Sequence, residues 1–199
     1  MKKIIRVSPK VLGLDVSTKT IGMALFDMNN KELLELTHIS PVIDSSEKEK
    51  NRILLLKSDI FRKKIREYLN AGITKVVIEE PLINSNNVYT VSTLMRFNSY
   101  ISKIIYDDLN VVPEFISTYE SRSFGFPELI KKNKNNKFVL FGGLPKNIDK
   151  KKIIWDLVAK KEPQIVWLYS KRNVLKKECF DMSDAYTCVQ GQMKKLKIW

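Results

Sequence analysis

The chain has 199 residues, of which 44% are hydrophobic, and its 35 Lys and Arg residues outnumber 22 Asp and Glu residues to give a formal net charge of +13. This composition excludes a disordered chain and predicts a single globular domain over residues 1–199. The positive charge predicts a polyanionic partner, nucleic acid before an anionic membrane surface. No apolar run is long enough for a signal peptide or a membrane span, so we expect a cytoplasmic protein without a membrane partner.

The first third of the chain predicts three strands and a long helix. Residues 11–14, 21–26 and 32–39 are apolar or alternate in hydrophobicity, which is typical of adjoining strands with at least one hairpin. The segment 45–72 has helical spacing of its apolar residues, opens with serines and acids, and ends at Gly72. We therefore expect one amphipathic helix over this segment.

The middle of the chain predicts a buried strand, a second helix and a short fifth strand. The β-branched run KVVIEEPL, residues 75–82, carries two glutamates and a proline at its end, which favours a buried strand that stops there. A helix is expected over residues 87–109 and a strand over residues 113–119. Tyr119 and Arg122, at and just after the end of that strand, either face a substrate or cap the sheet.

The predicted helix over residues 87–109 has a wide apolar surface. It covers an arc of roughly 200°, more than contact with one sheet requires. The arc is either covered by the rest of the chain or used for self-association, and both alternatives stay open. Its residues are Val91, Leu94, Met95, Phe97, Tyr100, Ile101, Ile104 and Ile105.

Residues 131–152 form a basic stretch that is rich in Asn and Gly and has no periodicity. Such a composition predicts a solvated loop. Phe138, Phe141 and the pair Gly142–Gly143 interrupt it, which suits a loop that contacts sugar, phosphate or bases.

A third helix is expected over residues 149–163. Lys150, Lys151 and Lys152 fall in its first turn, where positive charge opposes the helix dipole. A phosphate that approached this turn would relieve the repulsion.

Four acidic residues lie on segments that a folded core would partly bury. Asp15 falls within the first strand, Glu79 ends the fourth, and Asp181 and Asp184 open the last helix, where their charges repel each other. Each acid alone has an ordinary explanation as a surface residue, a helix cap or a salt-bridge partner. Together they predict a metal site, because three or four carboxylates can hold two Mg²⁺ ions, or Mn²⁺ in their place, about 4 Å apart.

The stretches that carry these acids resemble a known family. GLDVSTKTIG at 13–22, VVIEEP at 76–81 and DMSDAY at 181–186 resemble, in this order, the three acidic motifs of the RuvC-type Holliday junction resolvases in the ribonuclease H-like superfamily. The resemblance implies an α/β fold with a five-stranded mixed sheet flanked by helices and the first strand beside the fourth. It also implies that Asp15, Glu79 and the two acids of the last helix form one site.

The family pattern also bears on the residues around the strand-end acid. Successive strand residues point to opposite faces, so only one of Glu79 and Glu80 can join Asp15, and the resemblance selects Glu79. Family members often carry an aromatic residue three positions further on, which contacts bases at the junction. This chain has Leu82 there, so we expect little reading of sequence.

The resemblance, together with the positive charge, implies a metal-dependent endonuclease that selects branched DNA by shape and cuts it by paired nicks. The resemblance implies that a helix-opening lysine contacts the junction, with Lys150 the best match and Lys151 or Lys152 as alternatives. It also implies a homodimer, and the wide apolar arc of the helix over residues 87–109 is the interface that we expect. The alternatives are an RNA-processing nuclease of the same fold, a non-catalytic branched-DNA-binding protein, and an ATPase of the actin and sugar-kinase type, which requires a second glycine loop that the sequence does not contain.

Overall fold

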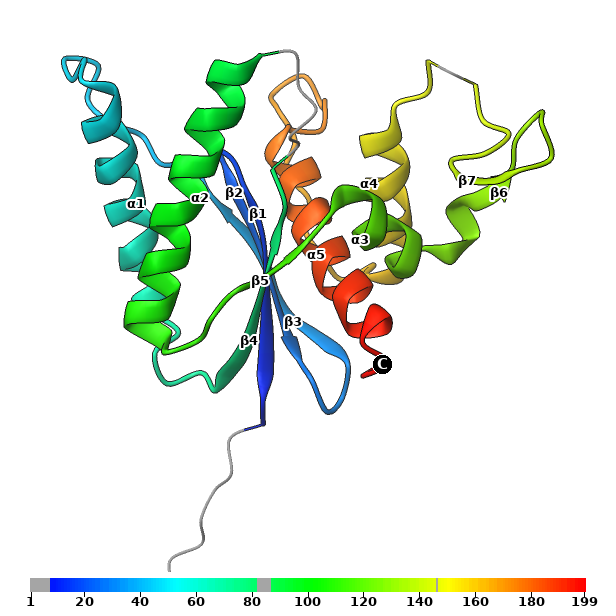
Figure 1. Cartoon of the computed structure of the whole chain (residues 1–199), viewed down its shortest axis with the longest axis horizontal. Coiled ribbons are helices and arrows are strands. Elements are labelled where there is room, and N and C mark those ends of the chain that lie inside the picture. The colour runs from blue at the N-terminus through cyan, green and yellow to red at the C-terminus, as the bar shows by residue number, and fades with distance from the viewer. Residues whose placement is uncertain (1–7, 82–86, 146) are drawn as a thin grey trace, which may run out of the picture.

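The computed structural model describes residues 8–81, 87–145 and 147–199, and its framework is a five-stranded mixed sheet (Figure 1). The elements in chain order are β1 (Lys10–Val16), β2 (Ile21–Asp27), β3 (Glu32–Ile39), α1 (Lys50–Arg66), β4 (Ile73–Glu79), α2 (Val88–Leu109), β5 (Glu114–Ile116), α3 (Thr118–Gly125), a 3₁₀ turn (Pro127–Leu129), β6 (Ile130–Lys132), β7 (Phe138–Leu140), α4 (Lys150–Lys161) and α5 (Glu178–Lys195). The sheet order is β3-β2-β1-β4-β5, with β1 antiparallel to β2 and parallel to β4. The predicted α/β class, with helices flanking a mixed sheet and the first strand beside the fourth, is confirmed.

The sheet separates two hydrophobic cores. Helices α1 and α2 cover one face, and α3, α4 and α5 cover the other (Figure 1). Because the central strands have a helical layer on each side, every residue of β2 is buried. The first core includes Phe61 of α1 and Phe97 of α2, and the second includes Ile154 of α4 and Tyr186 of α5.

Helix α5 lies directly against β1 and β2 because two glycines leave it room. A Cβ atom at Gly13 would overlap the carbonyl oxygen of Ala185, and one at Gly22 would overlap the carbonyl oxygen of Asp181. The absence of side chains at these two strand positions therefore sets how closely the first turns of α5 approach the sheet.

We expect Gly22→Ala to lower the free energy of unfolding by about 1 to 3 kcal/mol, the usual range for overpacking. The added methyl group meets backbone, which cannot swing aside as a flexible side chain can. Gly125→Ala is the milder control, since its Cβ would lie 3.3 Å from the Thr187 side chain. Urea unfolding of both variants checks the difference, and equal stability of Gly22→Ala and wild type would contradict this packing.

The first predicted helix begins and ends inside the segment expected for it. Residue 45 lies in a turn, and α1 starts only at Lys50, after Glu49, whose carboxylate accepts the backbone N–H groups of Asn51 and Arg52. The helix ends at Arg66, before the turns that lead into β4. A glutamate cap is less common than a serine cap, which is why the sequence pattern favoured the serines.

The predicted strand over residues 113–119 is too long, because β5 ends at Ile116. Ser117 then caps α3, accepting the backbone N–H of Glu120 at 3.2 Å while its own hydroxyl donates to the Glu120 carboxylate. This is a variant of the capping box, a local signal that overrides strand propensity.

The predicted loop over residues 131–152 contains a second, two-stranded sheet formed by β6 and β7. Strands of three residues are too short to show a readable alternation in hydrophobicity. The helix expected next is present as α4.

The apolar arc of α2 is mostly covered by the protein's own chain. Five of its eight residues, Val91, Phe97, Ile101, Ile104 and Ile105, are buried in the helix that packs on the sheet and on α1. Of the eight, Met95 is exposed, with 52% of its surface accessible.

Among the described residues, no helix is long and apolar enough to cross a membrane.

Candidate metal centre

Acidic residues from three elements meet where β1 and β4 end and α5 begins. Leu14 pairs with Ile78 across the parallel strands, so the next residues, Asp15 and Glu79, lie side by side. Asp184 reaches them from α5, and one carboxylate oxygen of each of these three residues lies within 4.8 Å of the others. Three of the four predicted acids are therefore brought together at the upper end of the sheet in Figure 1.

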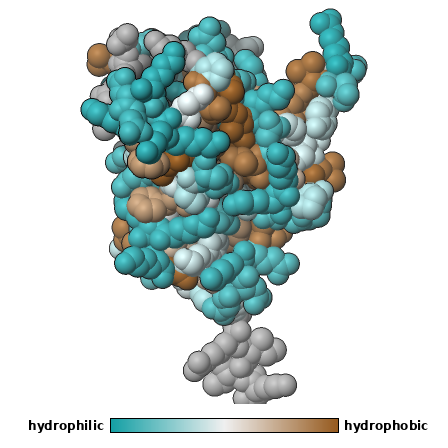
Figure 2. Space-filling model, turned by 90° about the vertical axis from the view of Figure 1, so that its right-hand side faces the viewer, coloured by the Kyte–Doolittle hydropathy of each residue, from teal (hydrophilic) through white to brown (hydrophobic). Residues whose placement is uncertain are grey.

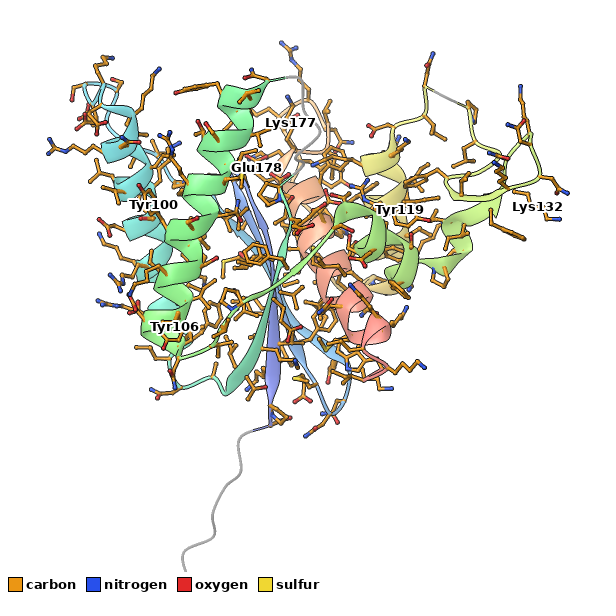
Figure 3. All side chains as sticks on the ribbon, viewed as in Figure 1. Tyr100, Tyr106, Tyr119, Lys132, Lys177 and Glu178 are labelled. Atoms are coloured by element: carbon orange, nitrogen blue, oxygen red, sulfur yellow. The ribbon has the colours of Figure 1, made fainter. Side chains whose placement is uncertain are left out.

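The fourth predicted acid, Asp181, lies one helical turn before Asp184 in α5 and is outside this group. Its charge still contributes to raising the pKa of Asp15. Figure 3 labels Lys177 and Glu178, which mark the start of this helix at the upper end of the molecule.

Glu80 lies on the other side of the sheet from the acids. It lines a groove with Pro81, Met95 and Phe115, next to α2, whereas Glu79 joins Asp15. The structure thus places these two neighbouring glutamates as the strand alternation predicted.

Burial and mutual repulsion make the ionised forms of Asp15, Glu79 and Asp181 unfavourable. Burial, then the charges of Glu79, Asp184 and Asp181, raise the pKa of Asp15 well above its usual value. Burial, followed by the charge of Asp184, raises the pKa of Glu79 to about 7. Burial likewise raises the pKa of Asp181. At neutral pH the cluster therefore favours binding either a proton or a cation.

Helix α3 orients two of the carboxylates by donating hydrogen bonds to them. The Thr118 hydroxyl donates a hydrogen bond to Glu79, and the Arg122 guanidinium donates to Asp184 Oδ1 at 3.0 Å. Because these residues are four positions apart, they lie on one face of the helix. The Arg122 side chain is 11% exposed and the Asp184 side chain 4%, so this ion pair is buried. This helix was not predicted from the sequence, which left the role of Arg122 open.

Of the three lysines predicted for the helix-opening position, Lys151 reaches the acids. Its Nζ lies 3.3 Å from Asp181 Oδ1 and 3.2 Å from Asp184 Oδ2. Burial alone would lower the pKa of Lys151, but the nearby carboxylates raise it above its usual value, so the ammonium stays charged.

The other two of these lysines, Lys150 and Lys152, make no ion pair with the acids in the described structure. The Nζ of Lys150 lies 5.6 Å from the centroid of the Phe141 ring, and Lys152 is exposed in the first turn of α4. Leu82 lies outside the described residues.

Comparison with known proteins bears on the fold. No protein-family model matches the chain, and no curated protein matches it. Among solved structures, RuvC from Thermus thermophilus in complex with a Holliday junction substrate is similar with a TM-score of 0.58 and 9% identity, over 95% of this chain and 96% of that one. A second T. thermophilus RuvC structure gives a TM-score of 0.55 and 11% identity, over 95% and 97%. The chain therefore has the ribonuclease H-like fold of RuvC.

Proposed function

We propose that this chain is a metal-dependent endonuclease that resolves four-way (Holliday) and other branched DNA by paired nicks. The observation that carries the proposal is that Asp15, Glu79 and Asp184, from distant parts of the chain, place carboxylate oxygens within 4.8 Å of one another. The net charge of +13 supports a nucleic-acid substrate, and the shared fold with a RuvC that was solved on a Holliday junction supports the branched form.

The donor set fits divalent cations such as Mg²⁺ and Mn²⁺. Carboxylate oxygens are the hard ligands that these ions prefer, and the Asp15 carboxylate makes no hydrogen bond or ion pair with a side chain or backbone group in the described part of the chain. Asp15, Glu79 and Asp184, together with Asp181, would hold two ions. When bound, such ions supply Lewis acidity for hydrolysis of a phosphodiester.

The chain's own residues orient the site and attract the substrate. Thr118 and Arg122 hold the carboxylates of Glu79 and Asp184 in fixed directions, which keeps the donor set ready for metal. The Lys151 ammonium lies at the edge of the acids, where it would neutralise part of the charge of the phosphate that is cut.

A cleft of about 640 Å³ opens beside Asp181, and we infer that DNA approaches the acids through it. Lys19, Lys151 and Lys177 line it and can contact phosphates, while the other charged residues of the lining, Asp149, Glu178 and Asp181, balance their charge. Contacts with phosphates position the DNA but carry no information on base sequence. We infer recognition by shape, with weak sequence preference.

A homodimer would place two such sites on opposing strands of a junction. Most of the predicted arc of α2 is used in the core, so the interface we infer is narrower than the sequence suggested. It consists of the exposed Met95 and Tyr106 on α2 and Phe115 on the edge strand β5, which line one groove of about 630 Å³. Two side-chain oxygens buried along it, Asn98 Oδ1 and Ser102 Oγ, have no hydrogen-bond partner in the described structure. Figure 3 labels Tyr100 and Tyr106 along this helix.

We expect the double variant Met95→Glu/Tyr106→Glu to be monomeric, because four like charges would meet at the two-fold interface. Sedimentation velocity measures the change, with wild type as the dimer. Leu69→Glu, exposed after the end of α1, is the control and should stay dimeric. A monomeric wild type, or a dimeric double variant, would show that this groove is not the interface.

Metal binding should depend on pH in a predictable direction. The raised pKa values of Glu79 and Asp15 mean that the folded, metal-free protein keeps protons that the unfolded chain releases. Its stability therefore falls as the pH rises from about 5 to 8. Mg²⁺ must displace those protons, so the increase in melting temperature that Mg²⁺ causes should grow over the same interval. Melting curves with EDTA or Mg²⁺ test this, and an increase that does not change with pH would count against the assignment.

The function is tested by incubating purified protein with a fixed four-way junction, a Y-fork, plain duplex and structured RNA, each with Mg²⁺ or Ca²⁺. We expect symmetric paired nicks in the junction with Mg²⁺ and intact duplex. Cleavage of the RNA instead would identify an RNA-processing nuclease, and binding of the junction without cleavage in any metal would identify a non-catalytic binding protein.

A further inference from the structure

The β6–β7 hairpin stands apart from the five-stranded sheet, at the right of Figure 1. A two-stranded hairpin on its own is only marginally stable, but the turn of this one is well defined. The Asn133 N–H donates to the carbonyl of Lys137 at 2.8 Å, and the Asn133 side-chain oxygen accepts the N–H groups of Asn135 and Lys137. The hairpin is therefore a defined projection that holds its side chains in fixed places.

Four exposed lysines give this projection an uncompensated positive charge. No Asp or Glu occurs between residues 129 and 148. None of the ion pairs among the described residues includes one of the four lysines. Side chains of like charge so close together repel one another, and a polyanion would relieve that repulsion. The lysines are Lys131, Lys132, Lys134 and Lys137.

An aromatic ring lies among these lysines. Phe138 is 67% exposed and pairs across the strands with Lys132, whose Nζ lies 5.5 Å from the ring centroid. Figure 3 shows Lys132 at the outer end of the molecule, and Figure 2 shows mainly hydrophilic side chains over this side, with smaller hydrophobic areas between them. An exposed ring next to cations is the combination that stacks on a nucleic-acid base and neutralises its phosphate.

The root of the hairpin is connected to the metal centre through α4. Phe141 is buried in the second core, and Lys150 lies over its ring. The next residue, Lys151, contacts Asp181 and Asp184. The first turn of α4 thus contacts the hairpin root on one side and the acids on the other.

We propose that the β6–β7 hairpin is an arm that binds one branch of the DNA, with its lysines on backbone phosphates and Phe138 stacked on a base that is unpaired near the branch point. This inference rests on the proposed function, because it takes branched DNA as the substrate. It adds the hairpin lysines as a second DNA-contacting surface, and it assigns to Phe138 the discrimination of branched DNA from duplex.

The lysine contacts are tested with Lys132→Ala/Lys137→Ala. Binding of a four-way junction is measured by fluorescence anisotropy with Ca²⁺ at several KCl concentrations. We expect weaker binding and a slope of log K against log salt concentration that is smaller by about 2, near 0.9 for each lost phosphate contact. The matched control is Lys63→Ala/Lys160→Ala, two exposed lysines in the last turns of α1 and α4, outside the hairpin.

The ring is tested with Phe138→Leu and Phe138→Tyr. Leucine keeps the apolar bulk without a flat face, so we expect affinity for the junction to fall roughly tenfold while affinity for plain duplex stays the same. Tyrosine should restore binding of the junction. Equal losses on junction and duplex would overturn the stacking role.

The failure of the arm and the failure of the proposed function are distinguishable. Suppose that wild type binds and cuts the junction, but Lys132→Ala/Lys137→Ala has the same affinity and salt dependence as Lys63→Ala/Lys160→Ala. The hairpin is then not a DNA-binding arm, and the nuclease assignment stands. If wild type binds no DNA at all, both are wrong. Melting temperatures equal to that of wild type would show that the variants fold.

Discussion

Glu79→Gln should lose junction cleavage by about a thousandfold or more while it keeps its affinity for the junction. A metal ligand contributes several kcal/mol of charge stabilisation in the transition state, and each 1.4 kcal/mol corresponds to about tenfold in rate. The amide removes one anionic donor from the group that Asp15 and Asp184 complete. Binding depends on lysines that the substitution leaves in place.

Glu80→Gln is the matched control for this experiment. It makes the same chemical change one residue further along the chain, on an exposed side chain outside the acid cluster. Glu80 lines the groove inferred as the dimer interface, but the amide removes a charge there and adds none, so we expect the dimer to persist and cleavage to proceed at the wild-type rate. Single-turnover cleavage and anisotropy in Ca²⁺ measure both variants, and normal cleavage by Glu79→Gln would refute the proposed site.

Arg122→Met should destabilise the metal-free protein by about 3 kcal/mol. Removing one partner of a buried ion pair leaves the other charge buried, which typically costs about 3 to 5 kcal/mol. We expect the lower end because Lys151 still lies 3.2 Å from Asp184 Oδ2. Urea unfolding in EDTA gives the difference.

A double-mutant cycle separates this charge effect from lost packing. In Arg122→Met/Asp184→Asn no unpaired charge remains, so the double variant should be less destabilised than the sum of the two single variants. Arg122→Lys should fall between wild type and Arg122→Met, since it keeps the charge and loses the planar guanidinium. Additive losses would mean that the ion pair has no role in stability.

The strands and the acids on them were predictable from the sequence because their patterns are long and continuous. The apolar runs around Asp15 and before Glu79 match β1 and β4, and β-sheet alternation correctly separated Glu79 from Glu80. Strand adjacency was not derivable from spacing. It came from the family resemblance, and the register of Leu14 with Ile78 agrees with it.

Helix α3, which holds the carboxylates of Glu79 and Asp184, was not predicted because it is short. It has eight residues, and its signal was the pairing of Ser117 with Glu120 at capping-box distance. Apolar and aromatic residues just before it favoured a longer strand. As a result, the roles of Thr118 and Arg122 became visible only in three dimensions.

The choice among the three lysines shows the limit of helical periodicity. Ile154 and Val158 of α4 face the core, which puts Lys152 on the far side of the helix. Lys150 and Lys151 both lie on the flanks of the buried face, so spacing does not separate them. The position of α4 against α5, which depends on tertiary packing, puts Lys151 next to the acids.

Calorimetric titration of Mn²⁺ into the metal-free protein at pH 8 tests most directly whether these carboxylates form a metal site. We expect wild type to bind Mn²⁺ saturably and Asp15→Asn to bind it at least about tenfold more weakly, because Asp15 completes the donor set. Wild type that takes up no Mn²⁺, or that binds it no better than Asp15→Asn, would contradict the central claim.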